Sequence, residues 1–244
     1  MSCTENFAID TETSGFEGIP VHHPNNFLIE LCCIHLATND RFSSYCIPDT
    51  PVPPQATKFN GITNDTLLGL GLKRDTLIRK FLDWVKAHTQ EGRTPMMIGH
   101  NIAFDHEILL KAMHGIVPTG RNGEKLGWVW YCTMKEMKHR YPDLKDTTSK
   151  FGKRPYVLEN CARFKLPGFN LKYHSATTDA EVAGTLFTVL NNEQAMSTAS
   201  PYWLVTTPAL LTHRELTSEG DVKPPILTLM RTIRGFKEYR VSFS

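Results

Sequence analysis

Residues 95–113 read PMMIGHNIAFDHEILLKAM, and this stretch decides which fold the sequence favours. Its first part, PMMIGHN, is a short apolar segment of the kind that forms a buried strand. AFDHEILLKAM follows at once and is expected to be a helix. A strand that leads directly into a helix is the repeating unit of α/β proteins.

The same alternation continues on both sides of this stretch. We expect strands at NFAID (6–10), FLIELCCIHLAT (27–38), RFSSYCIP (41–48) and WVWYCTM (128–134). We expect helices at LIRKFLDWVKAH (77–88), VLENCARFKL (157–166) and DAEVAGTLFTVL (179–190), and a Pro-rich loop at TPVPPQ (50–55). The pattern predicts an α/β sheet without internal repeats.

Composition excludes several other classes of protein. The chain has 244 residues, of which 41% are hydrophobic and 21% charged, so disorder, collagen and a disulfide scaffold do not fit. Six cysteines without a CxxC pair predict reduced thiols in an intracellular protein. No apolar run is long enough to span a bilayer, and the N-terminus has no secretory pattern.

The net charge of +2 conceals an uneven distribution. Residues 121–172 hold 12 basic and 5 acidic residues, whereas residues 1–120 hold 9 basic and 13 acidic ones. A basic segment of this kind fits either a solvated surface or a surface that meets a polyanion.

The last fifth of the chain has a weaker pattern. Helical periodicity fades after Leu190, and the small-residue segment MSTASP (196–201) resembles a linker. We therefore predict one domain over residues 1–195 and a C-terminal extension over residues 196–244. The extension either packs on the domain or docks a partner.

Asp10 and Glu12 stand two residues apart at the end of the first predicted strand, so their side chains point to one face. Two carboxylates held together repel each other unless a cation lies between them. In an α/β sheet, the carboxyl end of a strand is also where ligand sites gather.

Asp179 lies on a helix face that is otherwise apolar. It shares that face with Ala183, Leu186 and Leu190, which predicts that the face packs inward with Asp179 at its mouth. Thr178 and Glu181 fit a capping box, which would leave Asp179 available for another role. The alternative is an Asp favoured in the first turn by the helix dipole.

Asp105 opens the helix after PMMIGHN, and a first-turn Asp favoured by the dipole is again the alternative. The His106-Glu107 pair does not make a zinc helix of the HExxH type, because Leu110 occupies the second histidine position. His174 precedes Asp179 by five residues, in the loop before the helix.

Four segments together resemble one family of enzymes. They are AIDTETSG (8–15), FNGITNDTL (59–67), MIGHNIAFDHEIL (97–109) and YHSATTDAEVAG (173–184). In this order they resemble the motifs of DEDDh, DnaQ-like 3′→5′ exonucleases of the ribonuclease H-like superfamily. The resemblance covers about residues 5–192 and departs from the family pattern at Cys132-Thr133, where an Asp-Thr pair is usual.

The resemblance implies a mixed five-stranded sheet flanked by helices. It implies that Asp10, Glu12, Asp105 and Asp179 hold two divalent ions, Mg²⁺ or Mn²⁺, with Asp10 bridging both. It implies that His174 is the general base and that the product is a 5′-nucleoside monophosphate. Hard oxygen ligands suit these ions, and a pair of ions roughly 4 Å apart can activate water and stabilise the leaving oxygen.

The resemblance also places Thr13, Phe16 and Ile62 against the terminal bases of the substrate. Phe16 could stack on a base or pack under its own loop. His100 and Asn101 are expected to shape the strand-to-helix turn rather than to touch substrate.

Three hypotheses stay open at this point. The first is an active exonuclease on single-stranded 3′ ends, with DNA favoured and RNA trimming as the alternative. The second is a proofreading or processing module that works with a polymerase or another partner through the C-terminal extension. The third is a non-catalytic nucleic-acid-binding or scaffolding protein on the same fold.

Overall fold

The computed structural model describes residues 4–15, 21, 23–120, 123–145, 154–166 and 175–198. The chain divides into two compact units, Met1–Leu190 and Asn191–Ser244, and the first unit contains every element discussed below except the last eight residues of α7. The boundary predicted at residue 195 stays a prediction.

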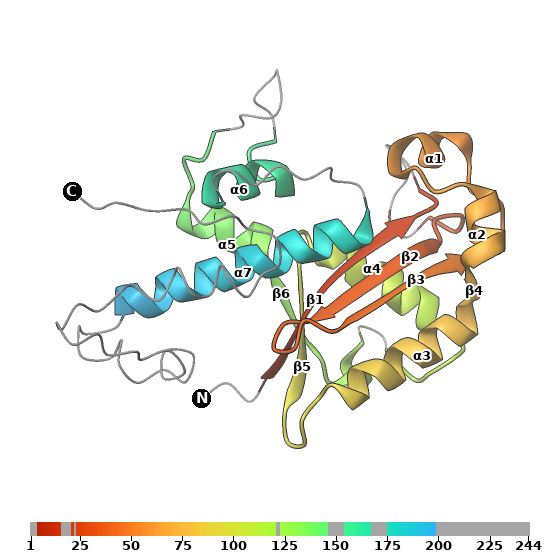
Figure 1. Ribbon diagram of the computed structural model, residues 1–244, viewed down its shortest axis with the longest axis horizontal. Helices are drawn as coiled ribbons and strands as arrows, with labels where there is room; N and C mark the ends of the chain where they lie inside the picture. The colour runs from red at the N-terminus through yellow and green to blue at the C-terminus, as the bar shows by residue number, and fades with distance from the viewer. Residues whose placement is uncertain are drawn as a thin grey trace, which may run out of the picture. The chain divides into compact units, whose positions relative to one another are not determined.

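A six-stranded mixed sheet forms the centre of the first unit (Figure 1). Its order is β4 (Leu72–Lys73), β3 (Arg41–Ile47), β2 (Leu28–His35), β1 (Thr4–Thr13), β5 (Thr94–Gly99) and β6 (Val129–Cys132). β2 pairs antiparallel with both β1 and β3. The pairs β1–β5, β5–β6 and β3–β4 are parallel.

The predicted α/β class and mixed sheet are confirmed, with one strand more than expected. The extra strand is β4, whose two residues pair with Cys46 and Ile47 at the sheet edge. Two residues are too few to produce a periodic pattern in the sequence.

Seven helices occur in the described part of the chain. They are α1 (Pro54–Asn60), α2 (Asn64–Leu70), α3 (Arg74–Ala87), α4 (Ala103–Met113), α5 (Thr133–Arg140), α6 (Leu158–Lys165) and α7 (Ala176–Thr198). A short 3-10 turn, η1 (Glu124–Leu126), precedes β6.

Three of these helices lie where the sequence pattern predicted none. α1 begins inside the expected Pro-rich loop, with Pro54 at its first position, where a missing N–H costs nothing. α2 has only 7 residues, fewer than two turns, and α5 is almost entirely polar, with Met134 and Met137 as its only apolar residues. α7 begins three residues before the predicted start and continues past Leu190.

The two faces of the sheet are covered by different helices. Phe7 and Ile9 of β1 belong to the main core, which also contains residues of α3 and α4 such as Phe81 and Ile108. Ala8, between them, lies in a second core with Ala176 and Ala180 of α7. Figure 1 accordingly shows α7 crossing one face while α3 and α4 lie on the other.

Small side chains let α7 lie very close to β1. Ala176 and Ala180 are fully buried against Ala8, and Gly184 continues the same face one turn later. A Cβ atom at Gly184 would come within 2.8 Å of the Ala8 Cβ and 2.9 Å of a Leu36 methyl carbon. The predicted inward face of this helix is also confirmed, because Ala183, Leu186 and Leu190 are buried.

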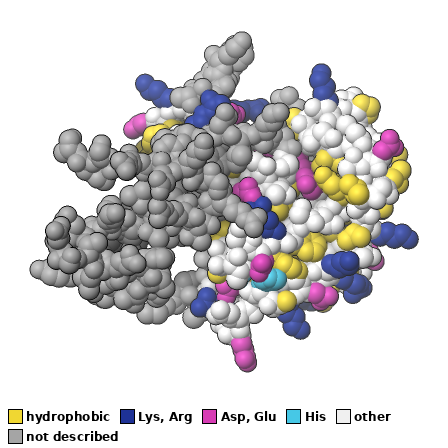
Figure 2. Space-filling model, in the orientation of Figure 1, with side chains coloured by type: hydrophobic (Ala, Val, Ile, Leu, Met, Phe, Trp, Pro, Cys, Tyr) yellow, Lys and Arg dark blue, Asp and Glu magenta, His cyan; other side chains and the backbone are white. Residues whose placement is uncertain are grey.

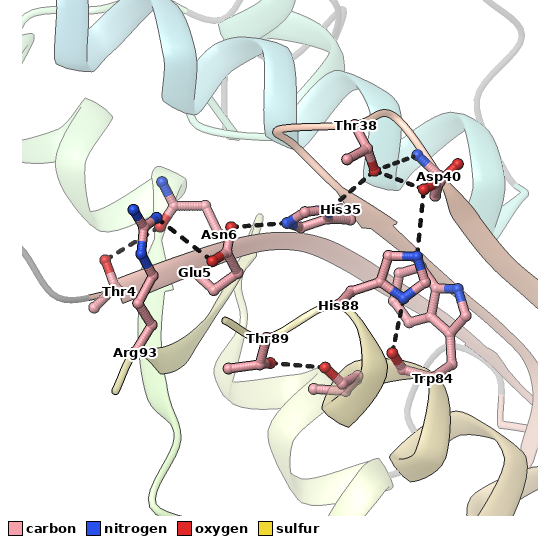
Figure 3. Close-up of polar contacts among 11 residues, drawn as sticks. Thr4, Glu5, Asn6, His35, Thr38, Asp40, Trp84, His88, Thr89 and Arg93 are labelled. Atoms are coloured by element: carbon pink, nitrogen blue, oxygen red, sulfur yellow. Dashed lines mark hydrogen bonds and ion pairs between the residues drawn. The ribbon is translucent and has the colours of Figure 1, made fainter. Parts of the chain in front are cut away.

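The amino end of β1 is closed by a polar network (Figure 3). Glu5, only 3% exposed, lies 2.8 Å from His35 Nε2 and 3.4 Å from Arg93 Nη1. The other ring nitrogen of His35 lies 2.9 Å from Thr38 Oγ1. The buried carboxylate at this end of the strand therefore has a hydrogen-bond partner in His35 and a cationic partner in Arg93.

No helix in the described ranges is long and apolar enough to cross a membrane.

The close approach of α7 to β1 predicts that Gly184→Ala destabilises the protein. Alanine normally favours a helix, but here its methyl group would meet the Ala8 Cβ, and overpacking typically costs about 1–3 kcal/mol. Gly69→Ala in α2 is the matched control, since nothing lies within 4 Å of the added atom.

Denaturant unfolding measures both changes. We expect Gly69→Ala to be neutral or to stabilise by up to about 1 kcal/mol. Equal shifts in the two variants would contradict the close packing of α7 on the sheet.

Candidate active site

The site lies at the carboxyl end of β1, where Asp10 and Glu12 leave the sheet on the side of α7. In the pairing of β1 with β2, Asp10 is opposite Cys32 and Glu12 is opposite Glu30. The register then shifts between Glu12 and Thr13, so regular pairing breaks just after the two acids. An irregularity at this point is a common way to aim side chains at a site.

Asp179 of α7 meets these two acids. One carboxylate oxygen from each of Asp10, Glu12 and Asp179 can be chosen so that all three lie within 4.8 Å of one another. Asp179 lies in the first turn of α7, where its own N–H donates to the Ser175 carbonyl at 3.0 Å. Three converging carboxylates form a donor set that suits a hard divalent cation.

The start of α7 differs from the predicted capping box. Ser175, rather than Thr178, caps the helix, and its hydroxyl oxygen accepts the Thr178 N–H at 3.2 Å. Glu181 forms an ion pair with Arg41 of β3 instead of reaching back to the helix start. The interpretation of Thr178 and Glu181 as a capping box is therefore wrong, because the helix begins earlier, at Ala176.

Asp105 approaches the same strand end from α4. It is 3% exposed, and one of its carboxylate oxygens accepts the Thr11 hydroxyl at 2.8 Å. Thr11 lies between Asp10 and Glu12 and points to the opposite face of β1. The strand thus carries Asp10 and Glu12 on one face, and on the other face its Thr11 hydroxyl orients Asp105.

The turn before α4 is built by His100 and Asn101, as expected. Asn101 adopts a left-handed backbone conformation with φ of 66°. Nδ1 of His100 lies 2.9 Å from Thr133 Oγ1, and Nε2 lies 2.7 Å from the Tyr156 carbonyl oxygen. Burial lowers the pKa of His100 to about 4, so the ring is neutral and structural near pH 7.

Electrostatics at the strand end disfavour the ionised acids in the protein alone. Burial and then the Asp179 carboxylate raise the pKa of Glu12 to about 8. Burial also raises the pKa of Asp105 to about 7, against the opposing effect of the Thr11 hydrogen bond. The pKa of Asp10 lies well above its ordinary value, because the residue is buried and three other carboxylates surround it.

No basic side chain among the described residues forms an ion pair with Asp10, Glu12 or Asp105. The contrast with Glu5, at the other end of the same strand, is direct. A bound cation would compensate the negative charge of these acids, since like charges taken out of water need compensation.

The residues predicted to contact substrate lie in different settings. Thr13 is buried, and its carbonyl oxygen accepts the Asn60 side-chain N–H at 3.2 Å. Ile62 is 5% exposed and packs with Ile29 and other apolar residues of a small core. Phe16 and His174 lie outside the described residues.

Two further residues near the site escaped the sequence analysis. Glu30 is 6% exposed and interrupts the apolar strand β2, which is the sequence signal that could have identified it. Phe59 precedes Asn60 at the end of α1 and is 64% exposed. Figure 2 shows hydrophobic side chains on the surface over α1 and α2, where Phe59, Leu68 and Leu70 are exposed.

The sequence matches the RNase_T family model, described as Exonuclease, over residues 7–187. It is 23% identical over 202 residues to DNA polymerase III subunit epsilon of Buchnera aphidicola from Acyrthosiphon pisum, with 80% of this chain and 76% of that protein covered. The same subunit of Escherichia coli K12 is 23% identical, with coverages of 78% and 73%.

Solved structures of exonuclease I share the fold. The enzyme from Methylocaldum szegediense has a TM-score of 0.58 and 19% identity, over 79% of this chain and 41% of that chain. E. coli exonuclease I in complex with a dT13 oligonucleotide has a TM-score of 0.60 and 15% identity, with coverages of 86% and 45%. This chain thus spans less than half the length of the exonuclease I chains.

The family match covers every described carboxylate of the site, and the mixed sheet with its flanking helices agrees with the ribonuclease H-like fold of the related structures. The predicted enzyme class, a 3′→5′ exonuclease, is thereby confirmed. The chain belongs to the RNase_T exonuclease family, the DnaQ-like group that its four sequence motifs resemble.

Proposed function

We propose that this exonuclease holds two divalent cations, Mg²⁺ or Mn²⁺, and releases 5′-nucleoside monophosphates from single-stranded 3′ ends. The observation that carries the proposal is the convergence of Asp10, Glu12 and Asp179 within 4.8 Å. No lysine or arginine among the described residues pairs with Asp10 or Glu12. The cluster therefore carries uncompensated negative charge on oxygen atoms, which are the ligands that hard cations prefer.

Each acid would have a distinct place in the site. Asp10 would contribute to both cation positions, Glu12 and Asp179 would complete one, and Asp105 the other. When bound, such cations supply an activated water and stabilise the leaving oxygen. The Thr11 hydroxyl would fix the Asp105 carboxylate, since its hydrogen bond already uses one oxygen of that group.

His174 would remove a proton from the attacking water. His174 precedes the first residue of α7 by two positions in the sequence and Asp179 by five. An imidazole with an ordinary pKa near 6.5 is suited to act as a base at neutral pH.

Thr13, Phe16 and Ile62 would form the surface that receives the terminal bases. Because Ile62 is buried, its contribution would be to support this surface from below. Phe59, which is exposed and lies three residues before Ile62, would add an aromatic ring to this surface. Bases stack on aromatic rings with little dependence on the nucleotide sequence.

DNA is the favoured substrate, and RNA trimming is the alternative. The relatives named above are a DNA polymerase subunit and an enzyme crystallised with a deoxyoligonucleotide, which supports DNA. The DNA polymerase III epsilon relatives support a polymerase as a partner, and residues 196–244 would dock that polymerase or another protein. Buried Cys32, Cys33, Cys46 and Cys161 are free thiols, which supports an intracellular location.

Asp10→Ala and Asp179→Ala are each expected to lower the rate of nucleotide release from a 3′-hydroxyl oligomer by about a thousandfold or more. The reason is that each substitution removes an oxygen from the cluster. Asp75→Ala is the control, because the Asp75 side chain is 64% exposed and lies in α3, away from the cluster. Full activity in a folded Asp10 or Asp179 variant would refute the site.

His174→Ala is expected to lower turnover by about 10²–10⁴-fold, the usual contribution of a general base. Binding of Mn²⁺, measured by calorimetry, should stay close to that of the wild type, because the acids remain. A variant that turns over at the wild-type rate would remove His174 from the mechanism.

The raised pKa values predict a pH-dependent gain of stability from metal. Glu12 and Asp105 have pKa values of about 8 and about 7 in the folded protein, against ordinary values of 4.5 and 3.8. At pH values between the ordinary and the raised pKa values, the folded state binds more protons than the unfolded chain. The free energy of unfolding in EDTA therefore falls as the pH rises toward about 8.

Because cations bind the deprotonated acids, the rise in Tm on adding Mg²⁺ should be larger near about pH 8 than near about pH 5. Thermal unfolding with and without EDTA measures this difference. An equal rise at both pH values would contradict binding at these acids.

A further inference from the structure

A further carboxylate, Glu30, lies beside the cluster in the middle of buried β2. Its Cα atom pairs with that of Glu12 on the neighbouring strand, so the two side chains share a face of the sheet. Glu30 is 6% exposed, in a strand whose eight residues are all buried. A carboxylate in this setting is costly for folding unless a donor meets it.

The donor is the backbone at the start of α7. The Ala176 N–H donates to Glu30 Oε2 at 3.1 Å. The first N–H groups of a helix have no partner within the helix, and a negative charge there also interacts favourably with the helix dipole. The Ser175 hydroxyl accepts the Thr178 N–H in the same first turn. The helix start is therefore held by one local side chain and by Glu30 from a distant strand.

This hydrogen bond acts where the position of α7 matters most for the cluster. Ala176 lies three residues, nearly one turn, before Asp179. Elsewhere α7 contacts the sheet through small side chains, notably Ala176 and Ala180 against Ala8 and Cys32, and through the Arg41–Glu181 ion pair and the ring contact of Tyr131 with Phe187. The Glu30 hydrogen bond is buried and holds a backbone group of the helix, whereas the Arg41–Glu181 and Ser43–Thr177 contacts join side chains that are partly or fully exposed. A directed hydrogen bond to the backbone therefore fixes the helix start.

We propose that Glu30 is a positioning residue, whose hydrogen bond to Ala176 sets the distance from Asp179 to Asp10 and Glu12. The inference rests on the proposed function, because it assigns Glu30 to the metal site. Glu30 acts through its acceptor oxygen and not as a ligand, and the group of described carboxylates that could share one cation does not include it.

Two substitutions of similar size separate the acceptor from the charge. Glu30→Gln keeps an oxygen that can accept the Ala176 N–H, and Glu30→Met keeps the volume but loses the acceptor. Glu5→Gln and Glu5→Met are the matched controls, since Glu5 is equally buried and hydrogen-bonded at the far end of the same sheet (Figure 3). Mn²⁺ affinity without nucleic acid is the first readout, and kcat and KM on a labelled oligomer are the second.

We expect Glu30→Gln to retain Mn²⁺ affinity and kcat within about threefold of the wild type. Glu30→Met should lose about 10–100-fold in Mn²⁺ affinity and in kcat, as is usual for groups that orient metal ligands. KM for the oligomer should stay unchanged, because Glu30 does not touch the substrate. Both Glu5 variants should lower Tm while the folded protein binds Mn²⁺ as the wild type does.

Two outcomes would overturn the proposal. If Glu30→Gln is as impaired as Glu30→Met, the charge and not the hydrogen bond is what matters. If Glu30→Met binds Mn²⁺ and turns over like the wild type, the bond does not set the site. A wild-type protein that binds Mn²⁺ but releases no nucleotide would refute the proposed function, while the affinities of the Glu30 variants would still decide this inference.

Discussion

Repulsion among carboxylates that are partly or fully buried is the constraint on which the rest of this structure depends. Asp10 and Glu12 leave β1 on one face, Asp179 arrives from α7, and Asp105 arrives from α4 at the strand end. Burial raises the pKa values of Asp10, Glu12 and Asp105, so holding these three groups together in ionised form is unfavourable in the folded protein. The free energy of burying the apolar cores offsets this unfavourable electrostatic contribution.

The architecture explains how the acids are held. Ala176, Ala180 and Gly184 let α7 lie against β1, while Glu30 and Ser175 satisfy the N–H groups at its start. On the other face, the Thr11 hydroxyl fixes Asp105. The two ends of β1 differ accordingly. Glu5 has His35 and Arg93 as partners, whereas no lysine or arginine among the described residues pairs with Asp10 or Glu12.

Much of this could be predicted from the sequence, for identifiable reasons. The strand-to-helix unit at 94–113 was predictable because a short apolar run leads directly into a helical segment, and the inward face of α7 because its apolar spacing extends over three turns. The acids Asp10, Glu12 and Asp179 were predictable because they occur where strands end or where an apolar helix face begins. The structure brings these three together as expected.

Other features depend on contacts between distant segments and could not be predicted. β4 and α2 are too short for periodicity, α5 is almost entirely polar, and Pro54 begins a helix in a segment that resembles a loop. The role of Thr11 depends on a residue 94 positions away, and that of Glu30 on one 146 positions away. The burial of Ile62 follows from packing between α1 and α2, which no local pattern encodes.

Anomalous diffraction from crystals grown with Mn²⁺ tests the central claim most directly. The account predicts a peak within about 2.5 Å of carboxylate oxygens from Asp10, Glu12 and Asp179, a distance typical of hard cations bound to oxygen. If dissolved crystals from the same batch degrade an oligomer from its 3′ end but no peak lies between these three residues, the account is wrong.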